Sequence, residues 1–140
     1  MSTTLFTDIA SLVTNDENLG KGILGEITEA AFIEEAGQIV WVGSKGSAPS
    51  ADIAVSLEGK SVIPGFVDSH AHLVFAGDRA LEFEARMSGK PYAASGIMTT
   101  VAATRAATDE ELDQNIATRA VEMYRGGITT FETKSGYGLD

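Results

Sequence analysis

The sequence contains no cysteine and is poor in histidine, proline and tryptophan. Its 140 residues include 2 His, 3 Pro and 1 Trp. Without cysteine the chain can form no disulfide, zinc–thiolate site or iron–sulfur cluster, and it has no thiol nucleophile. Any bound metal ion must therefore be held by histidine, aspartate or glutamate.

Basic residues are also scarce. Lys and Arg number 10 against 20 Asp and Glu, for a formal net charge of −10. Nucleic acids and anionic membranes bind basic surfaces, so we expect neither as a partner. No apolar run approaches the roughly 20 residues that a membrane helix needs, and residues 1–10 lack the regions of a secretory signal peptide. We expect a soluble, cytoplasmic protein.

Residues 1–62 are predicted to form short strands and turns. Hydrophobic residues make up 44% of the whole chain, enough for a packed core. The β-rich runs 31–33 and 39–43 flank the segment 34–38, which contains Gly37. This pattern predicts a β-hairpin with a five-residue loop. No helix of useful length fits this region.

Residues 63–140 have a different pattern, typical of an α/β fold. Segment 66–75 is a mostly apolar strand, which indicates burial on both faces. A short helix is predicted at 81–87, a long helix at 108–125 and a strand at 128–133. The order strand, helix, strand predicts a βαβ unit with parallel strands, whose carboxyl ends are where ligands bind in such folds.

The long helix has clear signals at both ends. Thr108 and Glu111 form a predicted capping box, and Gly126-Gly127 supplies a left-handed end. The residues that repeat at every fourth position predict one apolar stripe. These residues are Leu112, Ile116, Ala120 and Tyr124.

The two histidines, His70 and His72, are the strongest chemical signal. On a strand, a spacing of two residues places both rings on one face, where they can share a divalent metal ion. The alternative is one histidine packed in a core and one facing solvent. The apolar strand around them favours the metal site, because buried imidazoles without partners are unfavourable.

The segment Val62–His72 (VIPGFVDSHAH) resembles the first barrel strand of the amidohydrolase superfamily, in which the HxH pair binds metal. Further motifs resemble the narrower imidazolonepropionase family, and the resemblance covers roughly residues 62–140. These motifs are Leu73–Arg79, Glu82–Arg86, Thr100–Ala107 and Glu132–Leu139.

The resemblance implies a fold and a reaction. It implies that residues 63–140 are the first βαβ portion of an incomplete (β/α)8 barrel, preceded by a small composite β-sandwich region at residues 1–62. The enzymes of this family open the lactam ring of 4-imidazolone-5-propanoate with water, giving N-formimino-L-glutamate in histidine degradation. They use one zinc or iron ion, and the full-length protein is expected to be a homodimer.

The resemblance also implies roles for single residues. His70 and His72 match metal ligands, Arg79 matches the residue that meets the substrate carboxylate, and Tyr137 and Tyr92 match residues that line the substrate pocket. It places no catalytic acid or base in these residues.

Structural alternatives apply to two of these residues. Arg79 could instead be a surface arginine paired with Asp78 or Glu82, and Tyr137 could pack on the barrel rim. Arg79 has a planar fork that suits a carboxylate. The flanking Gly136 and Gly138 allow close approach to a ligand.

Two parallel strands do not close a barrel, so we expect this chain to be the N-terminal part of a longer protein and to be inactive alone. The remaining metal ligands and the acid–base groups would come from later strands. Two alternatives stay open. One is another cyclic amidase or deaminase of the same superfamily, and the other is a non-catalytic module.

Overall fold

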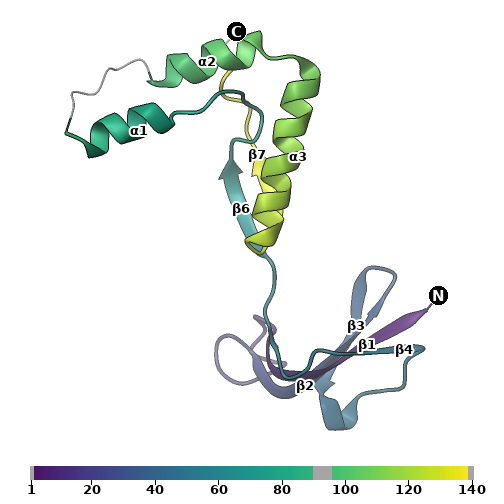
Figure 1. Cartoon of the computed structure of the whole chain (residues 1–140). Helices are drawn as coiled ribbons and strands as arrows, with labels where there is room; N and C mark the ends of the chain where they lie inside the picture. Colours follow the sequence, from purple (N-terminus) through teal and green to yellow (C-terminus); the bar gives the residue numbers. More distant parts are fainter. Residues whose placement is uncertain (1, 90–95, 139–140) are drawn as a thin grey trace. The chain divides into compact units, whose positions relative to one another are not determined.

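The computed structural model describes residues 2–89 and 96–138, which fall into two units, Met1–Pro64 and Gly65–Asp140 (Figure 1). The first unit contains β1 (Thr3–Val13), β2 (Glu26–Glu35), β3 (Gln38–Ser44), the 3-10 turn η1 (Lys45–Ser47), β4 (Ile53–Ser56) and β5 (Ser61–Val62). The second contains β6 (Phe66–Ala71), α1 (Ala80–Met87), α2 (Gly96–Ala106), α3 (Asp109–Arg125) and β7 (Ile128–Thr133).

The first unit is one five-stranded sheet. Its order is β3-β2-β1-β4, and β5 pairs with β1 as well. The β1–β2 and β2–β3 pairs are antiparallel, whereas β4 and β5 run parallel to β1. Its buried core is formed by Ile9, Leu12 and Ala30. Within residues 2–62 the only helical element is the three-residue η1, as the sequence predicts.

The predicted hairpin is confirmed, but its loop is shorter than expected. The turn consists of Ala36 and Gly37, which have φ angles of 51° and 81°. Two residues with positive φ are typical of the type I′ turn that matches strand twist. Glu34 and Glu35 pair with β3 rather than forming loop, and the Glu34 carboxylate accepts a hydrogen bond from the Gly37 N–H.

The second unit is built on the parallel pair β6–β7, with α1, α2 and α3 in the connection between the strands. The βαβ prediction is therefore confirmed. The strand β6 ends at Ala71 rather than continuing to residue 75. The prediction of burial on both faces is wrong for the described residues: Phe66 and Val67 are 55% and 70% exposed, because no helix in the described residues packs extensively over the faces of β6.

The helix α3 has the predicted ends and packs against β7 (Figure 1). The Thr108 hydroxyl accepts the Glu111 N–H at 3.2 Å, and the Glu111 carboxylate accepts the Thr108 N–H at 2.9 Å, so the capping box is confirmed. Gly127 has a φ of 87°. Tyr124 is 71% exposed, so the apolar stripe is one turn shorter than predicted.

The helix α2 was not predicted, because its alanines and threonines make no clear apolar period. It is held to the segment after β6 by a polar contact. The Thr104 hydroxyl accepts the Ala76 N–H at 3.1 Å and donates to the Thr100 carbonyl at 2.7 Å. Of the helices in the described residues, none is long and apolar enough to cross a membrane.

Candidate functional site

The candidate site lies where the two parallel strands of the second unit end. The Lys134 N–H donates to the Ala71 carbonyl at 2.8 Å and links the two ends. His72 directly follows β6, and the segment 134–138 directly follows β7. In parallel α/β folds this edge of the sheet is where ligands bind.

The two histidine rings lie next to each other at this edge. Their centroids are 5.3 Å apart and their planes make an angle of 72°. The two-residue spacing thus brings the rings together, as the sequence predicts. The expectation that both are buried is wrong in part: His72 is half-buried, but His70 is exposed. The Asp68 carboxylate accepts the His70 backbone N–H at 3.0 Å and holds the strand locally.

The His72 ring is oriented by the segment after β7. Its Nδ1 lies 3.2 Å from the Lys134 carbonyl oxygen. A carbonyl can only accept, so this contact requires a proton on Nδ1 and, in a neutral imidazole, leaves the lone pair on Nε2. Gly136 permits this close approach, because a Cβ there would lie 2.7 Å from both Nδ1 and Cε1 of His72. A hydrogen bond from the second ring nitrogen is typical of metal-binding histidines.

The separation of the two rings is that expected for two ligands of one metal ion. Two imidazoles on one tetrahedral ion, each at about 2.1 Å, would have ring centroids about 5 Å apart. The observed separation is 5.3 Å. A catalytic zinc site takes about three protein ligands. Within residues 2–89 and 96–138 no group of three or more His, Asp or Glu side chains could hold a metal, so His70 and His72 would supply part of the set.

The ring of Tyr137 packs against the ring of His72. Its ring centroid is 5.4 Å from that of His72 and 5.4 Å from that of Phe75. The tyrosine is half-buried. The structure therefore brings together three of the five predicted site residues, and Tyr92 lies outside the described residues.

Arg79 lies apart from this ring cluster, at the start of α1. Its Nε and Nη2 lie 3.1 Å and 3.0 Å from one oxygen of Glu82, so the ion pair considered as the alternative is formed. The Asp78 carboxylate accepts the Ala80 N–H instead. Arg79 and Glu82 line a cavity of about 260 Å³ together with Phe83 and Arg86, which leaves room beside the guanidinium.

Three residues at the site were missed in the sequence. Phe75 contacts Tyr137, and the side chains of Asn115 and Arg119 reach from α3 to the segment that follows β6. Asn115 and Arg119 could have been found from their i, i+4 spacing, which places both side chains on one face of the helix beside its apolar stripe.

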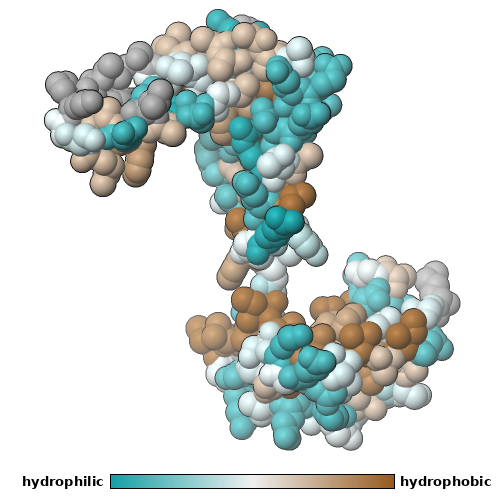
Figure 2. All heavy atoms as spheres, in the orientation of Figure 1, coloured by the Kyte–Doolittle hydropathy of each residue, from teal (hydrophilic) through white to brown (hydrophobic). Residues whose placement is uncertain are grey.

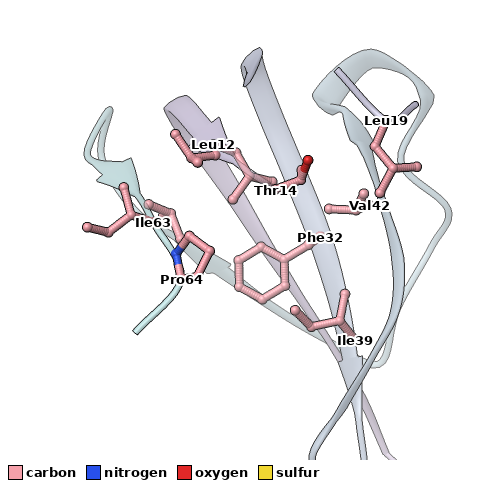
Figure 3. Close-up of a pocket in the computed structure, with 10 residues that line it drawn as sticks. Leu12, Thr14, Leu19, Phe32, Ile39, Val42, Ile63 and Pro64 are labelled. Atoms are coloured by element: carbon pink, nitrogen blue, oxygen red, sulfur yellow. The ribbon is translucent and has the colours of Figure 1, made fainter. Parts of the chain in front are cut away.

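A second cavity, in the first unit, carries no catalytic chemistry. It has a volume of about 250 Å³ and is drawn in Figure 3. Of the described residues that line it, Thr14 alone has a polar side chain and none is titratable. Hydrophobic residues, drawn in brown, show at the surface of this unit in Figure 2. Its exposed apolar side chains include Ile39 at 68% and Ile63 at 55% exposure.

The comparisons with known sequences agree on one family. The sequence profile described as "Amidohydrolase family" matches residues 54–137. The imidazolonepropionase of Streptomyces griseus is 61% identical over 140 residues, covering 99% of this chain. That of Mycolicibacterium smegmatis is 57% identical over 139 residues, again covering 99%. The chain spans only 36% and 35% of the length of these two relatives.

Solved structures show the same kind of fold at low identity. Guanine deaminase of E. coli is 18% identical with a TM-score of 0.63, over 95% of this chain and 30% of that protein. Atrazine chlorohydrolase from Arthrobacter aurescens TC1, complexed with zinc, is 20% identical with a TM-score of 0.60, over 93% and 28%. These likenesses support a mixed α/β fold, and the match to the amidohydrolase profile identifies it as the amidohydrolase type.

Proposed function

The chain belongs to the amidohydrolase family, and from this premise we propose that it carries the histidine pair and part of the substrate pocket of an imidazolonepropionase. The proposed reaction is the hydrolysis of 4-imidazolone-5-propanoate to N-formimino-L-glutamate, a step of histidine degradation in the cytoplasm. The observation that carries the proposal is the high identity to imidazolonepropionases along nearly the whole chain.

His70 and His72 are the proposed ligands of one zinc or iron ion. The adjacent rings and the Nδ1 contact of His72 with Lys134 support this role. When bound, such an ion lowers the pKa of coordinated water to about 7 and polarises the lactam carbonyl. His and carboxylate sites accept either metal, so the choice between zinc and iron is left to metal analysis.

Arg79 is the proposed partner of the propanoate carboxylate. Its side chain is 44% exposed and that of Glu82 25%, and ion pairs this accessible are worth at most about 1 kcal/mol. A substrate carboxylate that accepts two charge-assisted hydrogen bonds gains about 1.5–3 kcal/mol for each. Substrate can therefore displace Glu82 from the guanidinium at small cost.

Tyr137 and Tyr92 are the proposed tyrosines of the pocket. The contact of Tyr137 with the His72 ring supports its place beside the reacting carbonyl. In the reaction, water adds to the lactam carbon, the ring C–N bond breaks and the released nitrogen gains a proton. We assign no residue of the described chain as the acid or base of these steps.

The fold proposal follows the same family. We propose that β6 and β7 are the first two strands of a (β/α)8 barrel and that the first unit is part of a small β-sandwich region. Parallel pairing and a site at the carboxyl ends of the strands support the barrel. A homodimer is the proposed assembly.

The first prediction concerns substrate choice. The protein expressed from its own gene is expected to hydrolyse 4-imidazolone-5-propanoate, followed as loss of imidazolone absorbance and formation of N-formimino-L-glutamate by mass spectrometry. A ring analogue with methyl in place of the propanoate is expected to react at least about 100-fold less efficiently, because it loses the carboxylate contacts of Arg79.

A chimera provides the matched test. Residues 1–140 replace the corresponding segment of the Streptomyces griseus imidazolonepropionase, to which they align. We expect the chimera to retain imidazolone hydrolysis. A folded chimera with no turnover, together with an inactive product of the native gene, would refute the proposed function.

The second prediction concerns the glycine beneath His72. Gly136→Ala is expected to weaken metal binding about 10-fold or more, because the new methyl group forces the His72 ring away from the Lys134 carbonyl. Competition with a chromogenic chelator measures the affinity. Gly138→Ala is the matched control, since a Cβ at Gly138 would meet no atom of the described residues within 4 Å apart from its chain neighbours. Equal affinities in the two variants would contradict the proposed role of His72.

A further inference from the structure

Two polar side chains of α3 hold the segment that follows β6. Arg119 donates from Nη1 to the carbonyl oxygens of Leu73 at 2.7 Å and Phe75 at 2.8 Å. Asn115 donates from Nδ2 to the Phe75 carbonyl at 3.3 Å. The strand ends at Ala71, so these two carbonyls lie beyond its ladder and need other donors. The i, i+4 spacing puts both donors on one face of α3.

The Arg119 guanidinium also covers an aromatic ring. Its Cζ lies 3.5 Å from the centroid of Phe75, within the range of a cation–π contact. None of the ion pairs found among the described residues includes Arg119. Burial lowers the pKa of Arg119 from its ordinary value, although arginine stays charged at neutral pH. Within the described residues its guanidinium thus binds the backbone and ring of one segment, while the Glu122 carboxylate of the same helix interacts with its charge without forming an ion pair.

That segment is continuous with the candidate site through ring contacts. Phe75 meets Tyr137 edge-on at 5.4 Å, and Tyr137 lies 5.4 Å from His72. His72 in turn lies 5.3 Å from His70. A guanidinium that fixes Phe75 therefore fixes the surface on which Tyr137 rests.

We propose that Arg119 is a positioning residue, which sets the orientation of Tyr137 and His72 by clamping the Leu73 and Phe75 carbonyls and stacking on the Phe75 ring. The catalytic meaning of this role rests on the function proposed above. The claim that Arg119 sets the position of the Tyr137 ring does not depend on the proposed function.

Fluorine NMR of the 140-residue chain tests whether Arg119 sets the position of the Tyr137 ring. The chain has three tyrosines, so 3-fluorotyrosine labelling gives three signals, assigned with Tyr92→Phe and Tyr124→Phe. Arg119→Met is expected to shift the Tyr137 signal and to leave the Tyr124 signal in place. The control is Arg125→Met, at an exposed position of the same helix, which is expected to leave the Tyr137 signal in place. An unshifted Tyr137 signal in folded Arg119→Met overturns the proposal.

If Arg119→Met does not fold, two milder variants test whether Arg119 positions the Tyr137 ring. Arg119→Lys keeps the charge but loses the planar face over Phe75, and Asn115→Ala removes one donor to the Phe75 carbonyl. Both are expected to move the Tyr137 signal in the same direction by less. An unchanged signal in both variants overturns the proposal.

Kinetics separate positioning from simple destabilisation. In the protein expressed from its own gene, Arg119→Met is expected to raise KM for the imidazolone about 10-fold and to lower kcat/KM by up to about 100-fold, because the pocket tyrosine is misplaced. Loss of folded protein alone would lower the apparent kcat at unchanged KM, and that result contradicts a positioning role. If the unmodified protein expressed from its own gene does not turn over imidazolone, the proposed function fails while the fluorine signal still decides the role of Arg119.

Discussion

Replacing His72 with alanine (His72→Ala) is expected to lower kcat/KM for 4-imidazolone-5-propanoate by at least about 1,000-fold, since metal-ion activation of water and carbonyl is worth several kcal/mol and about 1.4 kcal/mol is a factor of ten. The transition metal that co-purifies is expected to fall from about one equivalent per chain to a trace, because a ligand is lost from the site. Steady-state kinetics and elemental analysis of the protein expressed from its own gene measure both effects.

His70→Ala is expected to behave like His72→Ala, since the two rings lie side by side and would share one ion. The control is Ser135→Ala, an exposed residue of the same segment as Tyr137, which is expected to keep metal and activity. Thermal unfolding followed by circular dichroism shows whether each variant is folded. A folded His72→Ala protein with full metal content and unchanged kcat/KM would contradict the proposal that His72 is a metal ligand.

Replacing Arg79 with methionine (Arg79→Met) is expected to raise KM for the imidazolone by about 100-fold, with a smaller change in kcat. Methionine has a side chain of similar length but donates no hydrogen bond, so the substrate loses two charge-assisted contacts of about 1.5–3 kcal/mol each. Water can replace part of these contacts, so the net loss of binding free energy is expected near the lower end of the summed range. Initial rates over a wide range of substrate concentration measure KM and kcat separately.

Two comparisons make this test specific to the carboxylate. The ring analogue without the propanoate should react equally with the unmodified protein and with Arg79→Met, because it has no group for Arg79 to bind. Glu82→Gln, which releases Arg79 from its ion pair, is expected to leave KM unchanged or to lower it slightly. A KM that Arg79→Met does not change would assign Arg79 to a structural ion pair with Glu82.

The parts of the second unit that were predicted well have local causes. The capping box of Thr108 and Glu111 depends on two side chains three residues apart, and the adjacency of His70 and His72 follows from the period of a strand. Both are independent of what packs around them. Helix α2 escaped prediction because its anchor, the contact of Thr104 with Ala76, joins residues that are far apart in the sequence.

The candidate site shows the same division. The motif in the sequence pointed to His70, His72 and Tyr137, but not to what holds them. Nothing in the sequence distinguishes Arg119 from an ordinary surface arginine of a helix. Its role follows from the contact of its guanidinium with the Phe75 ring, which lies in a different segment. The tautomer of His72 likewise depends on the Lys134 carbonyl, which is 62 residues away.

The sequence by itself determined the α/β class of the second unit, the ends of α3, the histidine pair and the absence of thiols from these residues, because propensity, periodicity and composition act over a few residues. Tertiary structure alone decided that β6 stops at Ala71 and that the Tyr137 ring contacts both Phe75 and His72. Each of these depends on which donors, acceptors and rings a distant segment brings within a few ångströms, and no local pattern encodes that distance.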